Sequence, residues 1–257
     1  MENADPGLRR VVEVIDKLIY RNGSLCIPFS EIKRETGFHP QVLTNLLRRG
    51  KAVGLIAECS ELGIGNNGYT TLPNYMVHLS YTFVNEVVDI FENYIVMRHL
   101  VKGKMYNNSQ SPFRGVVINV FGDIFFDKPL VYRGVNHYEV NWDKSNVGNY
   151  YIFHFDEDVE IKPRGIYEYE YEFYLKYFPP VDYFIVEPFN PAVLFYAKTY
   201  LTKGGRRVIE AVKVEYPQNV VIKEREGKTF HEIEVLKLST RPVKFKFYLT
   251  DLYSVKV

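Results

Sequence analysis

The segment HFDEDVE (154–160) places side chains that could bind a metal ion at every second position. Alternate side chains of a β-strand leave the same face, so four of them would share one side. These are His154, Asp156, Asp158 and Glu160. Imidazole and carboxylate groups could hold a divalent metal if the strand bent or bulged, and the protein would then be a metal-dependent hydrolase. A solvated strand that runs into an acidic turn is the simpler interpretation, so we predict no metal and no cofactor.

A second acidic pattern lies in GIYEYEYEFYLKYF (165–178), where aromatic residues alternate with Glu168, Glu170 and Glu172. The period of two predicts a strand with one aromatic face and one acidic face. Alternate residues on a strand lie about 6.6–7 Å apart, whereas Mg²⁺ needs oxygens at about 2.0–2.1 Å, so the row alone is no metal site. The segment VKFKFYL (243–249) offers Lys244 and Lys246. If the two strands are neighbours, we expect these lysines to pair with the glutamates on a wet face, and the aromatic faces to meet in the core.

Motifs for nucleophilic or phosphate chemistry are absent from the sequence. It has no G-x-S-x-G and no P-loop, and Glu210 with Lys213 matches a metal-dependent nuclease pattern poorly. Its two cysteines, Cys26 and Cys59, lack metal-type spacing. We expect buried thiols, with a disulfide as the alternative if the source is a hyperthermophile. An enzyme is therefore not the leading hypothesis.

The composition limits the class of protein further. With 257 residues and 46% hydrophobic content, the chain can form one or two domains with a core. A net charge of +1 restricts any nucleic-acid contact to a local patch. The first ten residues are polar, and charges interrupt the most apolar stretch, so we predict a cytoplasmic protein without a membrane span. Scarce glutamine beside abundant lysine and glutamate favours a thermophilic source, viral or archaeal.

The predicted elements give an α+β fold. Residues 7–72 mix three helices with short strands, and residues 80–102 have the apolar spacing of one long helix. A polar, turn-rich segment (102–115) follows, and the rest of the chain is strands and turns. We predict an N-terminal domain (1–79), a connecting helix and linker (80–114), and an all-β antiparallel sandwich or barrel (115–257).

The segment FSEIKRETGFHPQVLTNLLRRGKAVGLI (29–56), with Gly37 at the turn, resembles a winged helix-turn-helix domain that would span about residues 7–75. In that family the second helix of the motif enters the major groove of DNA. The resemblance implies base contacts by four outward residues of types that read base edges: Gln41, Thr44, Asn45 and Arg48. It implies phosphate contacts by four basic residues nearby: Lys33, Arg34, Arg49 and Lys51. The predicted wing, residues 58–69, has no lysine or arginine, which departs from DNA-binding wings.

These patterns lead to a DNA-binding protein of the transcription-regulator type. Its β domain would sense, oligomerise or dock, and helix 80–102 would form a homodimer that binds double-stranded DNA at two half-sites. The alternative is a structural or assembly protein, viral or from a multiprotein complex. In that case the winged domain would bind a protein partner at the acidic wing 58–69 instead of DNA.

Overall fold

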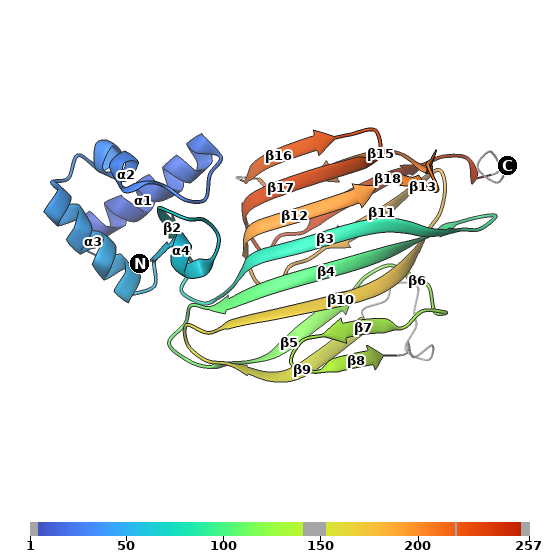
Figure 1. The fold of residues 1–257 in the computed structure, drawn as a ribbon, viewed down its shortest axis with the longest axis horizontal. Coiled ribbons are helices and arrows are strands. Elements are labelled where there is room, and N and C mark those ends of the chain that lie inside the picture. Colours follow the sequence, from blue (N-terminus) through green and yellow to red (C-terminus); the bar gives the residue numbers. More distant parts are fainter. Residues whose placement is uncertain (1–4, 141–152, 219, 253–257) are drawn as a thin grey trace.

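The computed structural model describes residues 5–140, 153–218 and 220–252. A helical unit at the N-terminus sits at one end of a body made of β-sheets (Figure 1). In these residues, no helix combines the length and the apolar character needed to cross a membrane.

The helical unit contains four helices and one small sheet among the described residues. Their bounds are α1 (Pro6–Asn22), α2 (Phe29–Thr36), α3 (Pro40–Ala52) and α4 (Cys59–Leu62), with β1 (Ile56–Glu58) antiparallel to β2 (Tyr69–Thr71). Asp5 caps α1, because its carboxylate accepts a hydrogen bond from the Gly7 amide at 2.8 Å. Gly23 and Gly37 end α1 and α2 in the left-handed conformation that glycine adopts without strain.

The largest sheet forms one layer of the body. Its strands lie in the order β16-β17-β12-β3-β4-β10-β7-β8, with β6 also paired to β10. All pairs are antiparallel except the parallel pair of β12 and β3. The bounds are β3 (Met76–Ile90), β4 (Ile95–Asn107), β6 (Asp123–Ile124), β7 (Leu130–Arg133), β8 (His137–Val140), β10 (Ile166–Tyr177), β12 (Ala192–Tyr200), β16 (Val221–Glu226) and β17 (Phe230–Leu238).

The second layer consists of two separate sheets. One has the order β11-β18-β15, and the other pairs β5 with β9. The bounds are β5 (Phe113–Val120), β9 (Phe153–Ile161), β11 (Val181–Val186), β15 (Ile209–Glu215) and β18 (Val243–Leu249), and β13 (Thr202–Lys203) and β14 (Arg206–Arg207) form a hairpin. Among the described residues, no strand pairing joins β5 to β11.

Aromatic residues of β10 form the centre of the core, as the alternation predicted. Tyr167, Tyr169, Tyr171 and Phe173 are buried, with successive rings stacked 5.8–6.1 Å apart. Across the sandwich the Tyr177 ring meets Phe247 edge-on at 5.2 Å. The prediction that the aromatic faces of 165–178 and 243–249 meet in the core is therefore confirmed. Buried aromatic side chains supply a large share of the apolar area that stabilises such a fold.

The predicted helix over 80–102 is wrong, because this segment forms most of the β3–β4 hairpin. The alternation of the two strands is masked by residues of unexpected polarity on each face. Asn85 and His99 point into the core, while Val84 and Val88 lie on the more exposed face. This exchange gave the apolar residues an apparent helical period. The predicted homodimer therefore loses the helix that would form it, and the oligomeric state stays a prediction.

The α+β fold with an N-terminal winged helix-turn-helix is also wrong, because the protein is mainly β-sheet. In the predicted wing, helix α4 follows β1 directly, and β1 and β2 have three residues each. The helical unit shares a core with the large sheet rather than standing apart, because Val77, Leu79 and Leu236 pack in its apolar cluster. The domain bounds 1–79, 80–114 and 115–257 stay a prediction, although β3 already begins at Met76.

Polar contacts also fix the helical unit to the sheets. The Lys237 ammonium donates to the Thr71 hydroxyl at 2.6 Å and lies 3.7 Å from the Asp16 carboxylate. Burial lowers the pKa of Lys237 to about 8. The Asn108 amide donates to the backbone carbonyls of Gly54 at 2.7 Å and Pro73 at 2.6 Å.

Cys26 and Cys59 form a disulfide, so the expected buried thiols are wrong and the alternative holds. The bond joins the segment after α1 to the start of α4, and the two cysteines are 33 residues apart in sequence. A cross-link that closes a loop of this length stabilises a fold by about 2–4 kcal/mol, mainly by restricting the unfolded chain.

We expect the double variant Cys26→Ala/Cys59→Ala to lose about 2–4 kcal/mol of unfolding free energy. Guanidinium unfolding followed by circular dichroism measures this loss. Wild-type protein unfolded in the presence of a thiol reductant is the control and should give a similar value. Equal stability of the variant and the oxidised wild type would show that the disulfide does not stabilise the helical unit.

Candidate functional site

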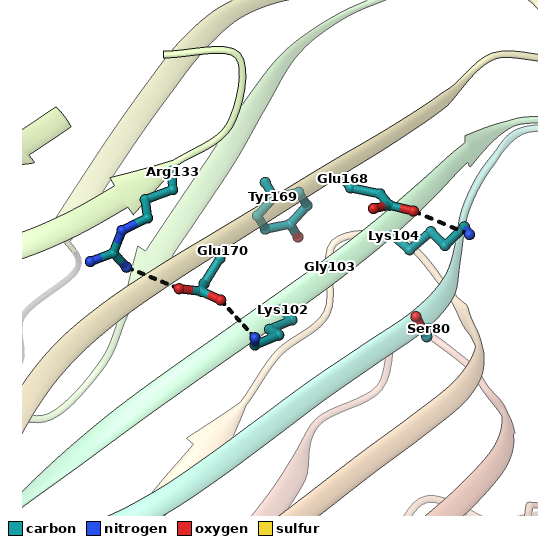
Figure 2. A pocket seen from close by; sticks show the side chains of 8 residues that line it. All are labelled: Ser80, Lys102, Gly103, Lys104, Arg133, Glu168, Tyr169 and Glu170. Atoms are coloured by element: carbon teal, nitrogen blue, oxygen red, sulfur yellow. Dashed lines mark hydrogen bonds and ion pairs between the residues drawn. The ribbon is translucent and has the colours of Figure 1, made fainter. Parts of the chain in front are cut away.

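The outer face of the large sheet has a hollow of about 420 Å³ where β4, β10 and β7 meet. Figure 2 shows the charged side chains around it. Glu170 accepts from Lys102 at 2.8 Å and from Arg133 at 2.9 Å, and Glu168 pairs with Lys104 at 3.1 Å. The wet-face prediction for the glutamates is thus confirmed.

The predicted partners of those glutamates are wrong. Lys244 and Lys246 lie on β18, between β11 and β15 in the other layer. The lysines opposite the acidic row come instead from β4, with Lys104 beside Glu168 and Lys102 beside Glu170. The charged side chains around the hollow neutralise one another in ion pairs. Exposed ion pairs contribute only about 0–1 kcal/mol each to the stability of a fold. The hollow is therefore not assigned as the functional site.

On the inner side of the same strands, the Tyr169 ring crosses β4 to reach β3. Tyr169 lies opposite Gly103 in the register, and a Cβ atom at Gly103 would overlap the ring. Glycine at this position therefore leaves the space through which the Tyr169 hydroxyl reaches His78 Nε2, at 2.8 Å. A β-bulge lies between His78 and Ser80, so that His78 and Tyr81 both point inward although they are three residues apart.

A cavity of about 190 Å³ lies beside His78, between the large sheet and the second layer. Its walls come from β3, β4, β5, β10 and the turn between β11 and β12. They are mainly apolar or aromatic, and the lining residues are His78, Tyr81, Met105, Phe113, Arg114, Gly115, Val116, Tyr169, Phe189 and Asn190. A buried water needs about 10–15 Å³ of such volume, so the cavity is large enough for a small organic molecule.

His78 is buried and presents a nitrogen that the described residues do not satisfy. Its ring stacks on Tyr81 at 4.6 Å, and Nδ1 makes no hydrogen bond of normal geometry in the described part of the chain. Burial lowers the pKa of His78 to about 4, while the nearby Asn190 backbone carbonyl opposes this shift. The imidazole is therefore neutral near pH 7. Burial also raises the pKa of Tyr81 to about 12, so its hydroxyl stays protonated.

A second buried histidine, His99, is fully hydrogen-bonded. Its Nδ1 lies 2.9 Å from the Asn85 side-chain oxygen, its Nε2 lies 2.9 Å from the Tyr177 hydroxyl, and Asn85 donates to Thr199 at 3.0 Å. Burial lowers the pKa of His99 to about 3. Both ring nitrogens of His99 and the Asn85 amide have partners in the described structure, so we assign this network to the stability of the core.

The candidate metal cluster of the sequence lies partly outside the described residues. The side chains of His154 and Asp156 are among those not described, whereas Asp158 is exposed and Glu160 pairs with Arg114 at 3.1 Å. Within the described residues, no group of three or more potential ligands comes together as a metal site.

The eight residues predicted to contact DNA belong to α2 and α3. Gln41, Thr44, Asn45 and Arg48 are exposed on α3, opposite the buried Leu43, Leu46 and Leu47, as their spacing predicted. Three of the four residues predicted to contact phosphates form ion pairs with acidic residues of the chain. Arg34 pairs with Glu31, Arg49 pairs with Asp5, and Lys51 pairs with both Glu58 and Glu61. Lys33 is exposed.

The acidic segment that departed from a DNA-binding wing thus neutralises Lys51 of the neighbouring helix. The Lys51 ammonium lies 2.6 Å from the Glu58 carboxylate and 2.7 Å from the Glu61 carboxylate, and these hydrogen bonds raise the pKa of Lys51. A protein partner at residues 58–69 stays a prediction.

A search against family models and a search against curated protein sequences found no match. Among solved structures, a Legionella pneumophila protein described as a candidate nutrient-binding protein is similar, with 7% identity over 70% of this chain and 69% of its own, and a TM-score of 0.41. The M1 zinc metallopeptidase of Deinococcus radiodurans has 10% identity over 68% of this chain and 43% of its own, with a TM-score of 0.35. The AChBP of Bulinus truncatus has 8% identity over 69% and 89%, with a TM-score of 0.27.

None of these three proteins is described as DNA-binding. The similarities are too weak to argue for a function, and the chain spans less than half of the peptidase. The prediction of a DNA-binding regulator is wrong, because the fold has neither the connecting helix nor the winged domain on which that prediction depended. The assembly-protein alternative depended on the same winged domain and falls with it.

The sequence did not single out His78 or Tyr169 as a pair. They are 91 residues apart, and their contact depends on the register that places Tyr169 opposite Gly103. Gly103, between Lys102 and Lys104, is the signal that was available, since glycine inside a strand often marks a close approach. That signal was lost because Gly103 lies in the segment 102–115, which was interpreted as a turn-rich linker and not as a strand.

We expect the two buried histidines to make the protein acid-sensitive. Their folded pKa values of about 4 and about 3 lie below the ordinary value of about 6.5, so protons bind the unfolded chain preferentially as the pH falls below about 6.5. Between about pH 6 and pH 4 each histidine should remove about 1.4 kcal/mol of unfolding free energy per pH unit. Urea unfolding at several pH values measures this slope. The variant His99→Gln should make this slope shallower, whereas the exposed-site control His137→Gln should not. Equal slopes for the two variants would show that the buried histidine does not cause the acid sensitivity.

We expect Gly103→Ala to displace the Tyr169 ring and to cost about 1–3 kcal/mol of unfolding free energy. Tyr169→Phe is the matched control, since it removes only the hydroxyl that contacts His78 and should cost about 1 kcal/mol. Thermal unfolding of both variants makes the comparison. Wild-type stability of Gly103→Ala would show that the ring does not need this space.

Proposed function

We propose that the protein is a small-molecule-binding protein whose ligand occupies the cavity beside His78. The ligand is a neutral, mainly apolar molecule about the size of one aromatic ring, with one hydrogen-bonding group. The observation that carries this proposal is His78 itself, which lines the cavity and whose buried Nδ1 has no hydrogen bond of normal geometry among the described residues. Buried polar atoms without a partner are rare and costly in folded proteins.

The chemistry of the walls supports a neutral ligand. Aromatic rings and Met105 line most of the cavity, and a charged molecule would lose its hydration there without gaining a counter-ion. The one charged residue of the lining, Arg114, is largely exposed and pairs with Glu160. The volume of about 190 Å³ is below the range of about 300–1,000 Å³ for drug-sized ligands.

The same walls favour binding over catalysis. The described lining has no carboxylate, serine or cysteine that could act as a nucleophile or base beside His78. The imidazole has a low pKa, which makes it a weak base at neutral pH, although it can still accept or donate one hydrogen bond. We therefore give His78 the role of orienting the ligand.

The cellular compartment of the protein is also part of this proposal. Disulfides are common outside the cytosol and also occur inside cells of hyperthermophiles. A cytoplasmic location, as proposed from the sequence, therefore goes together with a thermophilic source.

Phenol and toluene form a matched pair of probes, because they share their size and differ in one hydroxyl. We expect wild-type protein to bind phenol about five- to tenfold more tightly than toluene, since a hydrogen bond to His78 contributes about 1 kcal/mol. In His78→Phe the preference should disappear while toluene still binds. Titration followed by NMR spectroscopy measures both affinities, with His137→Gln as a control that keeps the preference. An unchanged preference in His78→Phe, or no binding of either probe to wild type, would overturn the proposal.

A further inference from the structure

The outer face of the small sheet β11-β18-β15 carries three lysines that make no ion pair with the acidic residues the structure describes. Among the described ion pairs, none involves Lys213, Lys244 or Lys246. The register places Lys213 directly opposite Lys246, and Glu215 opposite Lys244 without an ion pair. Like charges directly opposite each other on neighbouring strands destabilise a sheet. We call these three lysines, together with Tyr183 and Tyr248, the lysine patch.

The contrast with the large sheet shows that this arrangement is specific to one face. On the outer side of β10, Glu168 and Glu170 pair with cations of the neighbouring strands. The lysine patch occupies the corresponding outward positions of the second layer, and its lysines contact tyrosine rings instead of carboxylates. An unpaired positive face is a surface that an anionic partner can neutralise.

The tyrosines of the patch restrict which class of anionic partner can bind there. Lys244 Nζ lies 4.0 Å from the centre of the Tyr183 ring, and Lys246 Nζ lies 5.6 Å from it. Lys246 and Lys213 lie 5.1 Å and 5.4 Å from the centre of the Tyr248 ring. Because ammonium groups already lie over these rings, the patch offers little free ring surface for stacking bases, which single-stranded nucleic acids require.

Hydrogen-bond donors remain available at the patch. Each ammonium has three donors, and each phenol has one. The Lys246 and Lys213 ammonium groups both lie beside the Tyr248 ring, and their hydrogen bonds lower the pKa of the Tyr248 hydroxyl. Carboxylates accept hydrogen bonds from both ammonium and phenol groups.

The spacing of the lysines fits an extended chain. Lys244 and Lys246 are alternate residues of one strand, so they are separated by about 6.6–7 Å along it. Alternate side chains of an extended peptide have the same spacing. We propose that the lysine patch is a docking surface for an acidic protein segment, in which glutamate or aspartate side chains contact Lys213, Lys244 and Lys246.

The test uses a fluorescein-labelled peptide of ten glutamates, titrated with the full chain at low ionic strength and followed by fluorescence anisotropy. The variant Lys213→Gln/Lys246→Gln should bind about two- to fivefold more weakly for each lysine removed, hence about tenfold in total. Lys176→Gln is the matched control, because Lys176 also lies over a tyrosine ring, that of Tyr94, at 5.5 Å, but outside the patch. This control should bind like the wild type.

Three results would overturn the proposal. The first is that the wild type and the double variant bind the peptide equally well, or that neither binds it, while circular dichroism shows that both are folded. The second is patch-dependent binding of a ten-nucleotide oligothymidylate that is as tight as binding of the peptide, which would assign the patch to phosphates. The third is patch-dependent binding to vesicles of phosphatidylserine and phosphatidylcholine without binding of the peptide, which would assign it to a membrane surface.

Discussion

Strand β10 has to satisfy two opposite environments along its whole length, and the arrangement of the body follows from this constraint. Its aromatic side chains need a dry interior, and its glutamates need cations and water. Both needs are met because β4 lies beside it, with Gly103 and Val101 on the inner face and Lys102 and Lys104 on the outer face. A shift of the register by one residue would bury three carboxylates and expose four aromatic rings, so the pairing is strongly specified.

The interior of the sandwich is more polar than its composition suggests. Two histidines, an asparagine and several tyrosine hydroxyls lie among the aromatic rings, and most of them are hydrogen-bonded to one another. Such networks help to specify one packing arrangement, because each member fits only where its partner is. His78 differs from His99 in lining a cavity and in having one nitrogen without a hydrogen bond of normal geometry among the described residues, and this difference separates a candidate binding site from a structural network.

The sequence allowed some features to be predicted correctly and hid others for identifiable reasons. The two faces of β10 followed from its strict alternation, and the buried face of α3 followed from the spacing of its leucines. The β3–β4 hairpin was mistaken for a helix because Asn85 and His99 face inward while Val84 and Val88 face the more exposed side. The strand partners of Glu170 and Glu168 are Lys102, which lay in the predicted helix, and Lys104, which lay in the predicted linker, so Lys244 and Lys246 were chosen instead. His78 and Tyr169 meet only through the pairing of three strands, which no local pattern reports.

The division of the second layer into two sheets has a mechanical consequence. Since no strand pairing joins β5 to β11 among the described residues, these two strands can move apart without loss of ladder hydrogen bonds between them. Among the described residues, side chains of β5 and β11 meet without strand pairing, and packing contacts of this kind can exchange for contacts with a guest molecule. The large sheet is continuous behind both small sheets, so its own ladder hydrogen bonds do not depend on the contact between β5 and β11.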